Sequence, residues 1–301
     1  MEGHSKSFSR HAPSFALLIV ALLWGSSLVV VKDTTDSLRP NFLLGCRFTL
    51  ATLILAPFAW SDLRTMTLRH WRKASMVGLF LFLAYSSQTL GVTFAPAGRS
   101  AFLSATYCVL VPFVHWAIAG RKPSRNNLLS AFLCLIGVAL VARGQEGMSL
   151  QGLSLGDALA LLSGFLFASH IVAVEHWGRE IKPLTVTVMQ FAVAAVLSWV
   201  TSFLIEDWSG QVFSSGAVMG LLYLALFCTA TALFLQNWGQ KRVSPATAAI
   251  ILGLESVFGV VFSRLFHKEQ ITLLASLGFV FILAAIFLAE VKLTKKKSAS
   301  H

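Results

Sequence analysis

The sequence is dominated by apolar stretches about 20 residues long, separated by short charged connections. A helix of about 20 apolar residues is long enough to cross the hydrocarbon core of a bilayer. The connections are too short to form a soluble domain. The pattern predicts an all-α integral membrane protein with ten transmembrane helices, at residues 15–31, 41–60, 74–94, 97–119, 127–142, 155–176, 184–205, 217–239, 245–266 and 271–291.

The composition excludes most soluble classes of protein. Charged residues make up 12% of the chain and hydrophobic residues 56%, whereas a soluble domain has about 25% charged residues. So few charges could not cover the surface of a water-soluble fold, and a disordered chain would be more polar. The net charge of +11 is spread in small groups between the apolar runs. This distribution is typical of membrane topology and argues against nucleic-acid binding.

The basic residues are distributed unevenly between the two sides of the predicted bundle. The connections on the side of both termini carry 17 Lys and Arg residues, and those on the opposite side carry 6. Under the positive-inside rule, this predicts a multi-pass protein of the cell (inner) membrane with N- and C-termini in the cytoplasm. Residues 292–301 form a basic cytoplasmic tail that we expect to contact anionic lipid.

No chemistry-bearing motif occurs in the sequence. It contains no zinc-protease, nucleophile-elbow or phosphate-loop pattern, so we expect neither an enzyme nor an ATP-driven pump. The four cysteines lie singly inside apolar stretches and have no neighbouring histidine cluster, so we expect buried free thiols, with no metal and no cofactor.

Short strings recur in the second half of the chain in the same order as in the first. The matches lie at offsets of 139, 143 and 148 residues, and loop-length differences between two copies would produce such a drift. The matched strings are Leu22-Leu23-Trp24-Gly25 with Leu161-Leu162-Ser163-Gly164, Pro40 and Arg47-Phe48 with Pro183 and Gln190-Phe191, and Gln88-Thr89-Leu90-Gly91 with Gln236-Asn237-Trp238-Gly239.

These matches predict two copies of a five-helix unit, at residues 15–142 and 155–291. Because five is odd, the second copy crosses the membrane in the opposite sense. Inverted repeats of this kind build many secondary transporters, whose substrate site lies near the midplane between the halves.

The ordered strings also point to a known family. They are Leu23-Trp24-Gly25-Ser26-Ser27, Arg47-Phe48 after Pro40, Ala101-Phe102-Leu103 leading to Val111-Pro112, and Gly253-Leu254-Glu255-Ser256-Val257-Phe258. Together they resemble the EamA family of the drug/metabolite transporter superfamily, over residues 14–291. The resemblance implies two EamA repeats, a central cavity and transport of small metabolites, often outward. Ser256 departs from the pattern, because the family usually has proline after the glutamate.

Two ionisable residues inside the spans are the first candidates for a functional site, because charge within a bilayer is costly. Glu255 is ten residues into its helix, about 15 Å deep, and is a candidate to bind a proton or a cationic group. Arg47 lies about 9 Å from the outer end of its helix and could hold a substrate carboxylate. It could equally pair with an internal acid or extend to the interface.

The other candidates are polar and aromatic. Ser100, Ser104, Tyr107 and His115 share one face of the fourth span, and at an offset of 148 Tyr107 is the counterpart of Glu255. We expect these two residues to face each other across a cavity. The remaining substrate-binding or coupling candidates are Tyr85, Gln88, Gln236, His170 and Trp24. For His170 a packing role is the more common alternative, and Trp24 could equally line the cavity or face the lipid.

The leading interpretation is a secondary transporter that exports small metabolites such as amino acids, by alternating access around a midplane cavity. Its partners would be a small-molecule substrate and the lipid bilayer, with a proton as the candidate coupling ion. One alternative is an exchanger of nucleotide sugars or sugar phosphates, which should place several basic residues inside the membrane. The other is a membrane protein that does not transport.

Overall fold

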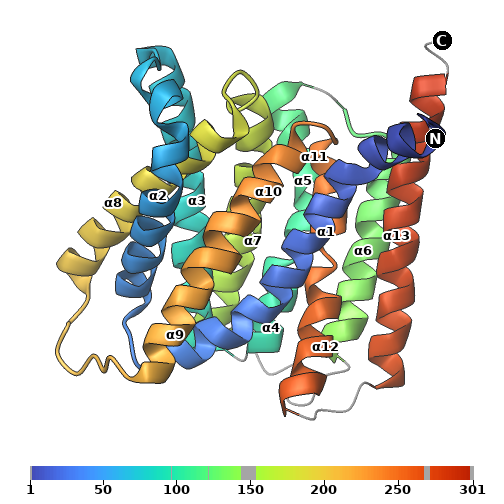
Figure 1. The fold of residues 1–301 in the computed structure, drawn as a ribbon. Helices are drawn as coiled ribbons and strands as arrows, with labels where there is room; N and C mark the ends of the chain where they lie inside the picture. Colours follow the sequence, from blue (N-terminus) through green and yellow to red (C-terminus); the bar gives the residue numbers. More distant parts are fainter. Residues whose placement is uncertain (1, 96, 121, 144–153, 268–271, 299–301) are drawn as a thin grey trace.

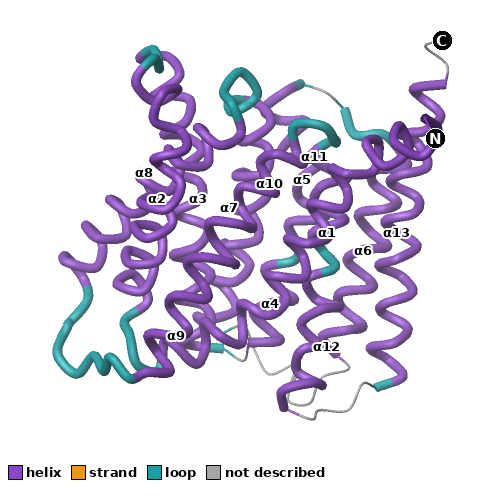
Figure 2. Tube along the Cα trace, in the orientation of Figure 1, coloured by secondary structure: helices purple, strands orange, loops and turns teal. Residues whose placement is uncertain are grey.

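The computed structural model describes residues 2–95, 97–120, 122–143, 154–267 and 272–298, and these parts of the chain are helical apart from turns (Figures 1 and 2). The first half contains α1 (Glu2–Thr35), α2 (Pro40–Arg64), α3 (Leu68–Phe94), α4 (Ala97–Ser104), α5 (Tyr107–Ala119) and α6 (Arg125–Arg143). The second half contains α7 (Leu155–His176), α8 (Pro183–Ile205), α9 (Ser215–Tyr223), the π-helix η1 (Leu224–Thr231), α10 (Ala232–Gln240), α11 (Pro245–Leu252), α12 (Glu255–His267) and α13 (Leu273–Ser298).

These elements form the ten predicted transmembrane helices. Seven helical stretches in the described parts are long and apolar enough to cross a membrane, and three more are apolar but shorter, at Arg125–Val141, Pro245–Gly259 and Leu273–Ala289. The start of α1 and the end of α13 lie at the same end of the bundle (Figure 1). We call this the terminal end, and the opposite one the distal end.

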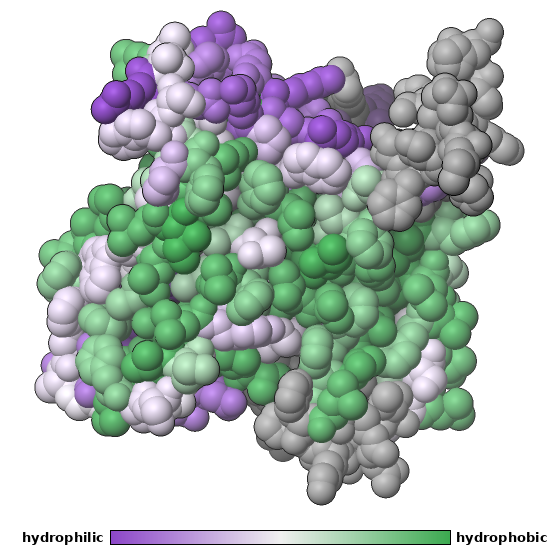
Figure 3. Space-filling model, in the orientation of Figure 1, coloured by the Kyte–Doolittle hydropathy of each residue, from purple (hydrophilic) through white to green (hydrophobic). Residues whose placement is uncertain are grey.

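The surface of the bundle suits a lipid environment. Figure 3 shows a broad band of apolar side chains across the middle of the molecule, with hydrophilic residues gathered at the terminal end. Large apolar side chains on the described helices are exposed, including Phe58, Leu204 and Phe287. An apolar surface of this extent is unfavourable in water and is explained by contact with acyl chains.

The two halves are interleaved, which places their interface at the centre of the bundle. Helix α1 packs against α12, α2 against α8, α3 against α7, and α6 against α13. Pro40 and Pro183 each stand at the first turn of their helix, where the missing N–H of proline costs nothing. These helices start at matching prolines, so the repeat seen in the sequence is also a repeat of structure.

Two predicted helices are discontinuous, which corrects the expectation of single helices at 97–119 and 245–266. The first is broken between Ser104 and Tyr107, and the second between Leu252 and Glu255. Both breaks fall at an offset of 148 residues, so they are counterparts in the repeat. The second break occurs although Ser256 replaces the proline that the family resemblance leads one to expect there. A third departure is η1, which interrupts the predicted helix 217–239.

Candidate functional site

A single cavity near the middle of the bundle brings together residues from both halves. The empty space between its walls, including the part open to solvent, is about 510 Å³. Seven of the eight site residues predicted from the sequence line it, and His170 does not. The lining consists of Trp24, Ser27, Leu28 and Val31 of α1, Arg47 of α2, Tyr85 and Gln88 of α3, Tyr107 of α5, Phe167 and Ile171 of α7, Gln236 of α10 and Glu255 of α12.

Tyr107 and Glu255 meet at the two helix breaks. Each is the first residue of a half-helix, α5 or α12, and the hydroxyl of Tyr107 donates a hydrogen bond to Oε1 of Glu255 at 3.3 Å. Glu255 forms no ion pair with any basic residue that the structure describes. Its carboxyl group is therefore positioned by a neutral donor and stays free to bind a proton or a cation.

Glycines on the neighbouring helices lie directly against the two breaks. A Cβ atom on Gly164 of α7 would lie 2.6 Å from Oγ1 of Thr106 and 2.8 Å from the carbonyl oxygen of Ser104. At its counterpart, Gly25 of α1, a Cβ atom would lie 2.6 Å from Cβ of Phe258 and 2.9 Å from the carbonyl oxygen of Glu255. Any side chain would collide at either position, so glycine permits each helix to approach a break closely.

Arg47 is buried at the wall of the cavity, and no carboxylate of the described residues pairs with it. Its side chain is 1% exposed, and it donates from Nε to Oγ1 of Thr229 and from Nη2 to the carbonyl oxygen of Cys228, at 3.4 Å. Both acceptors belong to η1. A π-helix changes the hydrogen-bond register of a helix, and such segments are frequent at functional sites. Here it presents a hydroxyl and a carbonyl group to a buried cation.

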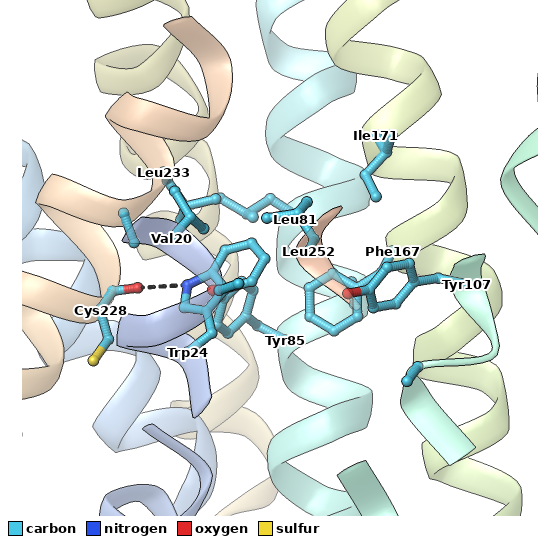
Figure 4. Packing of buried hydrophobic residues seen from close by; sticks show 14 of the residues in the cluster. Val20, Trp24, Leu81, Tyr85, Tyr107, Phe167, Ile171, Cys228, Leu233 and Leu252 are labelled. Atoms are coloured by element: carbon cyan, nitrogen blue, oxygen red, sulfur yellow. Dashed lines mark hydrogen bonds between the residues drawn. The ribbon is translucent and has the colours of Figure 1, made fainter. Parts of the chain in front are cut away.

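Three aromatic rings connect Arg47 to the Tyr107–Glu255 pair. The guanidinium carbon of Arg47 lies 4.9 Å from the ring centroid of Tyr85. The Tyr85 ring meets Phe167 edge to face at a centroid distance of 5.3 Å, and Phe167 meets Tyr107 in the same way at 6.4 Å. Figure 4 shows these three rings at one level of the bundle. The cavity therefore has a cationic and an acidic group joined by an aromatic wall.

Trp24 and the two glutamines complete the polar lining. The indole Nε1 of Trp24 donates to the carbonyl oxygen of Cys228 at 3.0 Å, which ties α1 to η1. Gln88 and Gln236 are counterparts at an offset of 148, and both line the cavity. Gln236 is 1% exposed, and its Oε1 has no hydrogen-bond partner among the described residues. A buried unpaired amide oxygen at a cavity wall is available to a ligand.

The structure places several predicted residues away from the cavity. Nε2 of His170 forms a hydrogen bond with Oε1 of Gln190 at 3.0 Å, between α7 and α8. Ser104 bonds to Ser163 at 2.9 Å. His115 lies 3.7 Å from the carboxylate of Glu175. The predicted polar face of the fourth span is therefore divided, and of these residues only Tyr107 reaches the cavity.

Sequence reasoning missed five lining residues, for which signals existed. Ser27, Leu28 and Val31 follow Trp24 at spacings of three, four and seven residues, which places them on one helix face. Phe167 is the counterpart of Leu28 at an offset of 139, and Ile171 lies one turn beyond Phe167. Extending the Trp24 face and then applying the repeat offset would have identified Phe167.

A layer of apolar side chains packs against the cavity on the terminal side of Trp24 and Tyr85. Val20, Leu81, Leu233 and Leu252, which we call the apolar plug, are fully buried. Figure 4 shows Val20, Leu81 and Leu233 on one side of Trp24 and Tyr85. Val20 and Leu81 each precede a lining residue by one turn in a helix that starts at the terminal end. On the other side, Ser27, Leu28 and Val31 carry the lining toward the distal end of α1.

Comparison with known proteins identifies relatives over the whole length of the chain. The profile of the EamA-like transporter family matches residues 12–143 and 154–290. A protein of Archaeoglobus fulgidus named "Uncharacterized transporter" is 28% identical over 293 residues, covering 97% of this chain and 90% of that protein. The Bacillus subtilis "Uncharacterized transporter YvbV" is 22% identical and covers 98% of this chain and 97% of its own. A crystal structure superposes with a TM-score of 0.78 at 14% identity, over 94% of this chain and 97% of the other, so the two share a fold.

Proposed function

We propose, from the premise that the chain belongs to the EamA-like transporter family, that this membrane transporter is a secondary transporter which exports small metabolites such as amino acids. Transport would proceed by alternating access, in which the cavity opens to one end of the bundle and then to the other. The outward direction is the expectation from the family resemblance and belongs to this proposal.

One observation carries the choice of substrate class. Arg47 and Glu255 line the same cavity, neither forms an ion pair with a described residue, and an aromatic wall joins them. A guanidinium group binds a carboxylate through paired hydrogen bonds. A carboxylate binds an ammonium group, and aromatic faces attract cations. A zwitterionic metabolite such as an amino acid carries both complementary charges.

The cavity fits the alternative cargo less well. Nucleotide sugars and sugar phosphates are anionic, and their binding favours several converging basic side chains. Arg47 is the one basic residue among those that line the cavity. A membrane protein that does not transport would have no need of two charged groups beside an open space at mid-depth, because buried charges are costly.

We further propose that Glu255 couples transport to protons. A carboxyl group hydrogen-bonded to Tyr107 and lacking a basic partner can hold either a proton or the ammonium group of a substrate. Competition between the two at one site would link their movements. The surplus of Lys and Arg on the side of both termini supports a cytoplasmic terminal end in the cell membrane.

Purified protein in liposomes provides the test. Vesicles are loaded with a pool of labelled amino acids, and the efflux of each is followed with and without an imposed pH gradient. We expect saturable, gradient-dependent movement of a subset of them, while empty liposomes show none. Uptake of sugar phosphates or nucleotide sugars in place of amino acids, or no movement of any metabolite pool, would contradict the proposal.

A further inference from the structure

The repeat relates half of the cavity lining in pairs. When the sequence offsets of 139, 143 and 148 residues are applied to the structure, three pairs of counterparts both line the cavity. These pairs are Leu28 with Phe167, Gln88 with Gln236, and Tyr107 with Glu255. In each pair, one residue comes from the first half of the chain and the other from the second.

The other six lining residues have counterparts that do not line the cavity, and these six are Trp24, Ser27, Val31, Arg47, Tyr85 and Ile171. Two of them concern one interface. Val31 and Arg47 line the cavity, but their counterparts, His170 and Gln190, do not. His170 and Gln190 are instead bonded to each other at 3.0 Å and are 1% and 0% exposed. The cavity therefore extends to Val31 and Arg47 in the first half. At the equivalent positions of the second half, His170 and Gln190 are packed together and the cavity does not reach them.

The closed positions belong to a polar interface on α8, which is contacted there by His170 of α7 and by α10. Nδ2 of Asn237 donates to Oγ1 of Thr187 at 2.7 Å, and Thr187 and Gln190 share one face of α8. We call this interface the α8–α10 seam, and it consists of His170, Thr187, Gln190, Gln236, Asn237 and Gln240. Gln236 also lines the cavity, and the seam reaches the terminal end, where α8 begins and α10 ends.

Unpaired polar atoms are concentrated in this seam. Among the described residues, Nε2 of Gln190, Oε1 of Gln236, Oδ1 of Asn237 and both side-chain amide atoms of Gln240 have no hydrogen-bond partner. All four side chains are at most 3% exposed. Buried polar atoms are nearly always paired, and an unpaired amide group is especially costly within a membrane. The interface therefore carries a desolvation cost in this arrangement, and water or ligand partners would relieve it.

From this asymmetry we infer that the α8–α10 seam is the route by which the cavity opens to the terminal end. In that state, His170 and Gln190 would line the cavity at the positions equivalent to those of Val31 and Arg47, and the apolar plug would separate. Water entering the seam would pair the amide atoms that are now unsatisfied. The inference rests on the proposed function, because it assigns the second opening of the same alternating cavity.

Cysteine accessibility tests the route. Gln190→Cys and Asn237→Cys are placed in the seam and exposed to a membrane-impermeant maleimide from the terminal side of vesicles. Thr185→Cys is the matched control, because Thr185 is also buried, unpaired and near the same end of α8 but faces away from Thr187, about 200° around the helix. The unmodified protein provides the blank.

We expect both seam cysteines to react several-fold faster than Thr185→Cys. Conditions that speed their labelling, such as added substrate or a shift in pH, should slow the labelling of Ser27→Cys from the distal side, because the two openings alternate. If Gln190→Cys does not fold, Thr187→Cys on the same face replaces it. Seam cysteines that react no faster than Thr185→Cys under any condition, in protein that transports, would overturn the inference.

A second variant tests the proposed route independently of the proposed transport function. Gln240→Leu removes two unpaired amide atoms and should hold the seam shut, lowering the turnover of transport several-fold while substrate binding from the distal side is unchanged. Unchanged turnover would refute the route and leave the transporter proposal intact. Alternating labelling in a protein that moves no metabolite would support the route while the proposed cargo failed.

Discussion

Tyr107 and Glu255 are 148 residues apart in the chain, occupy the same position in the two repeats, and are joined by a hydrogen bond of 3.3 Å. Each begins the half-helix that follows a break, so the contact joins the two breaks directly. Tyrosine is a neutral donor, so it orients the carboxyl group of Glu255 without compensating its charge. The same position in the two copies has thus diverged into an acid and the group that holds it.

Glu255→Gln should abolish the dependence of transport on a pH gradient. Glutamine has nearly the same shape and can still accept from Tyr107, but it cannot exchange a proton. We expect accumulation against a gradient to be lost, while downhill movement of substrate persists. Transport into liposomes with and without an imposed pH gradient measures this, and size-exclusion chromatography checks folding. Full concentrative transport by the variant would exclude Glu255 as the coupling group.

Tyr107→Phe is the matched change on the other side of the pair. It removes one hydroxyl group and keeps the ring that packs against Phe167. Since a hydrogen bond to a charged group contributes about 1.5–3 kcal/mol, we expect about a tenfold loss of coupled transport with a retained pH response. A variant that behaves like Glu255→Gln would show that the hydroxyl itself carries the proton.

Arg47→Lys should weaken binding of carboxylate substrates by about tenfold or more, because lysine cannot form paired hydrogen bonds with a carboxylate. The control is a substrate amide that lacks the carboxylate, whose transport should change little. KM values for an amino acid and its amide, measured in both proteins, test this. Equal losses for the two compounds would indicate that Arg47 acts only by holding η1.

Gly25→Ala and Gly164→Ala should each destabilise the fold by about 1–3 kcal/mol, the usual cost of overpacking. In both cases a Cβ atom would lie 2.6 Å from a neighbour at a helix break. Gly216→Ala is the control, since a Cβ atom there approaches nothing closer than 3.9 Å. Thermal denaturation in detergent should show a lower midpoint for the first two variants. The midpoint of the control should be unchanged. Native-like midpoints would mean that the breaks tolerate separation from α1 and α7.

The Lys73–Glu180 contact should make stability at the terminal end depend on pH. A hydrogen bond of 2.5 Å from Lys73 and its positive charge hold the pKa of Glu180 below its usual value. A lowered pKa means that the contact stabilises the fold above the pKa of the unfolded carboxyl, about 4.3, and that this is lost as pH falls through the folded value.

We therefore expect Glu180→Gln to have a slightly lower thermal midpoint than the native protein at neutral pH. The difference should disappear in acid and shrink at high salt, because Glu180 is exposed and screened. A difference that persists in acid would point to packing instead of charge as its cause.

The sequence predicts the spans closely, because apolar length and charge patterning act locally. Residues 155–176 were predicted as a helix, and α7 has those bounds. The repeat offset led to the expectation that Tyr107 faces Glu255, since symmetry in sequence carries over to position in space.

The breaks and η1 could not be predicted in the same way. Neither proline nor glycine occurs at Ala105 and Thr106, where the first break lies. The break instead lies against Gly164 of another helix. No local sequence pattern reveals such a contact between helices. His170 is a similar case, because its sequence position inside a span is that of a lining residue. Its contact with Gln190 of another helix, α8, places it outside the cavity.

The π-helical segment also sets the rotation of α10, the helix that follows it in its span. Because one residue of an α-helix corresponds to about 100° of rotation, accommodating an additional residue in η1 turns α10 by roughly a quarter of a revolution. Were this segment to rewind into regular α-helix, Gln236 would swing away from the centre and Asn237 would lose its neighbour on α8, with no peptide unit unfolded. A change in the ring size of a few hydrogen bonds in η1 would thus rotate α10 about its own axis.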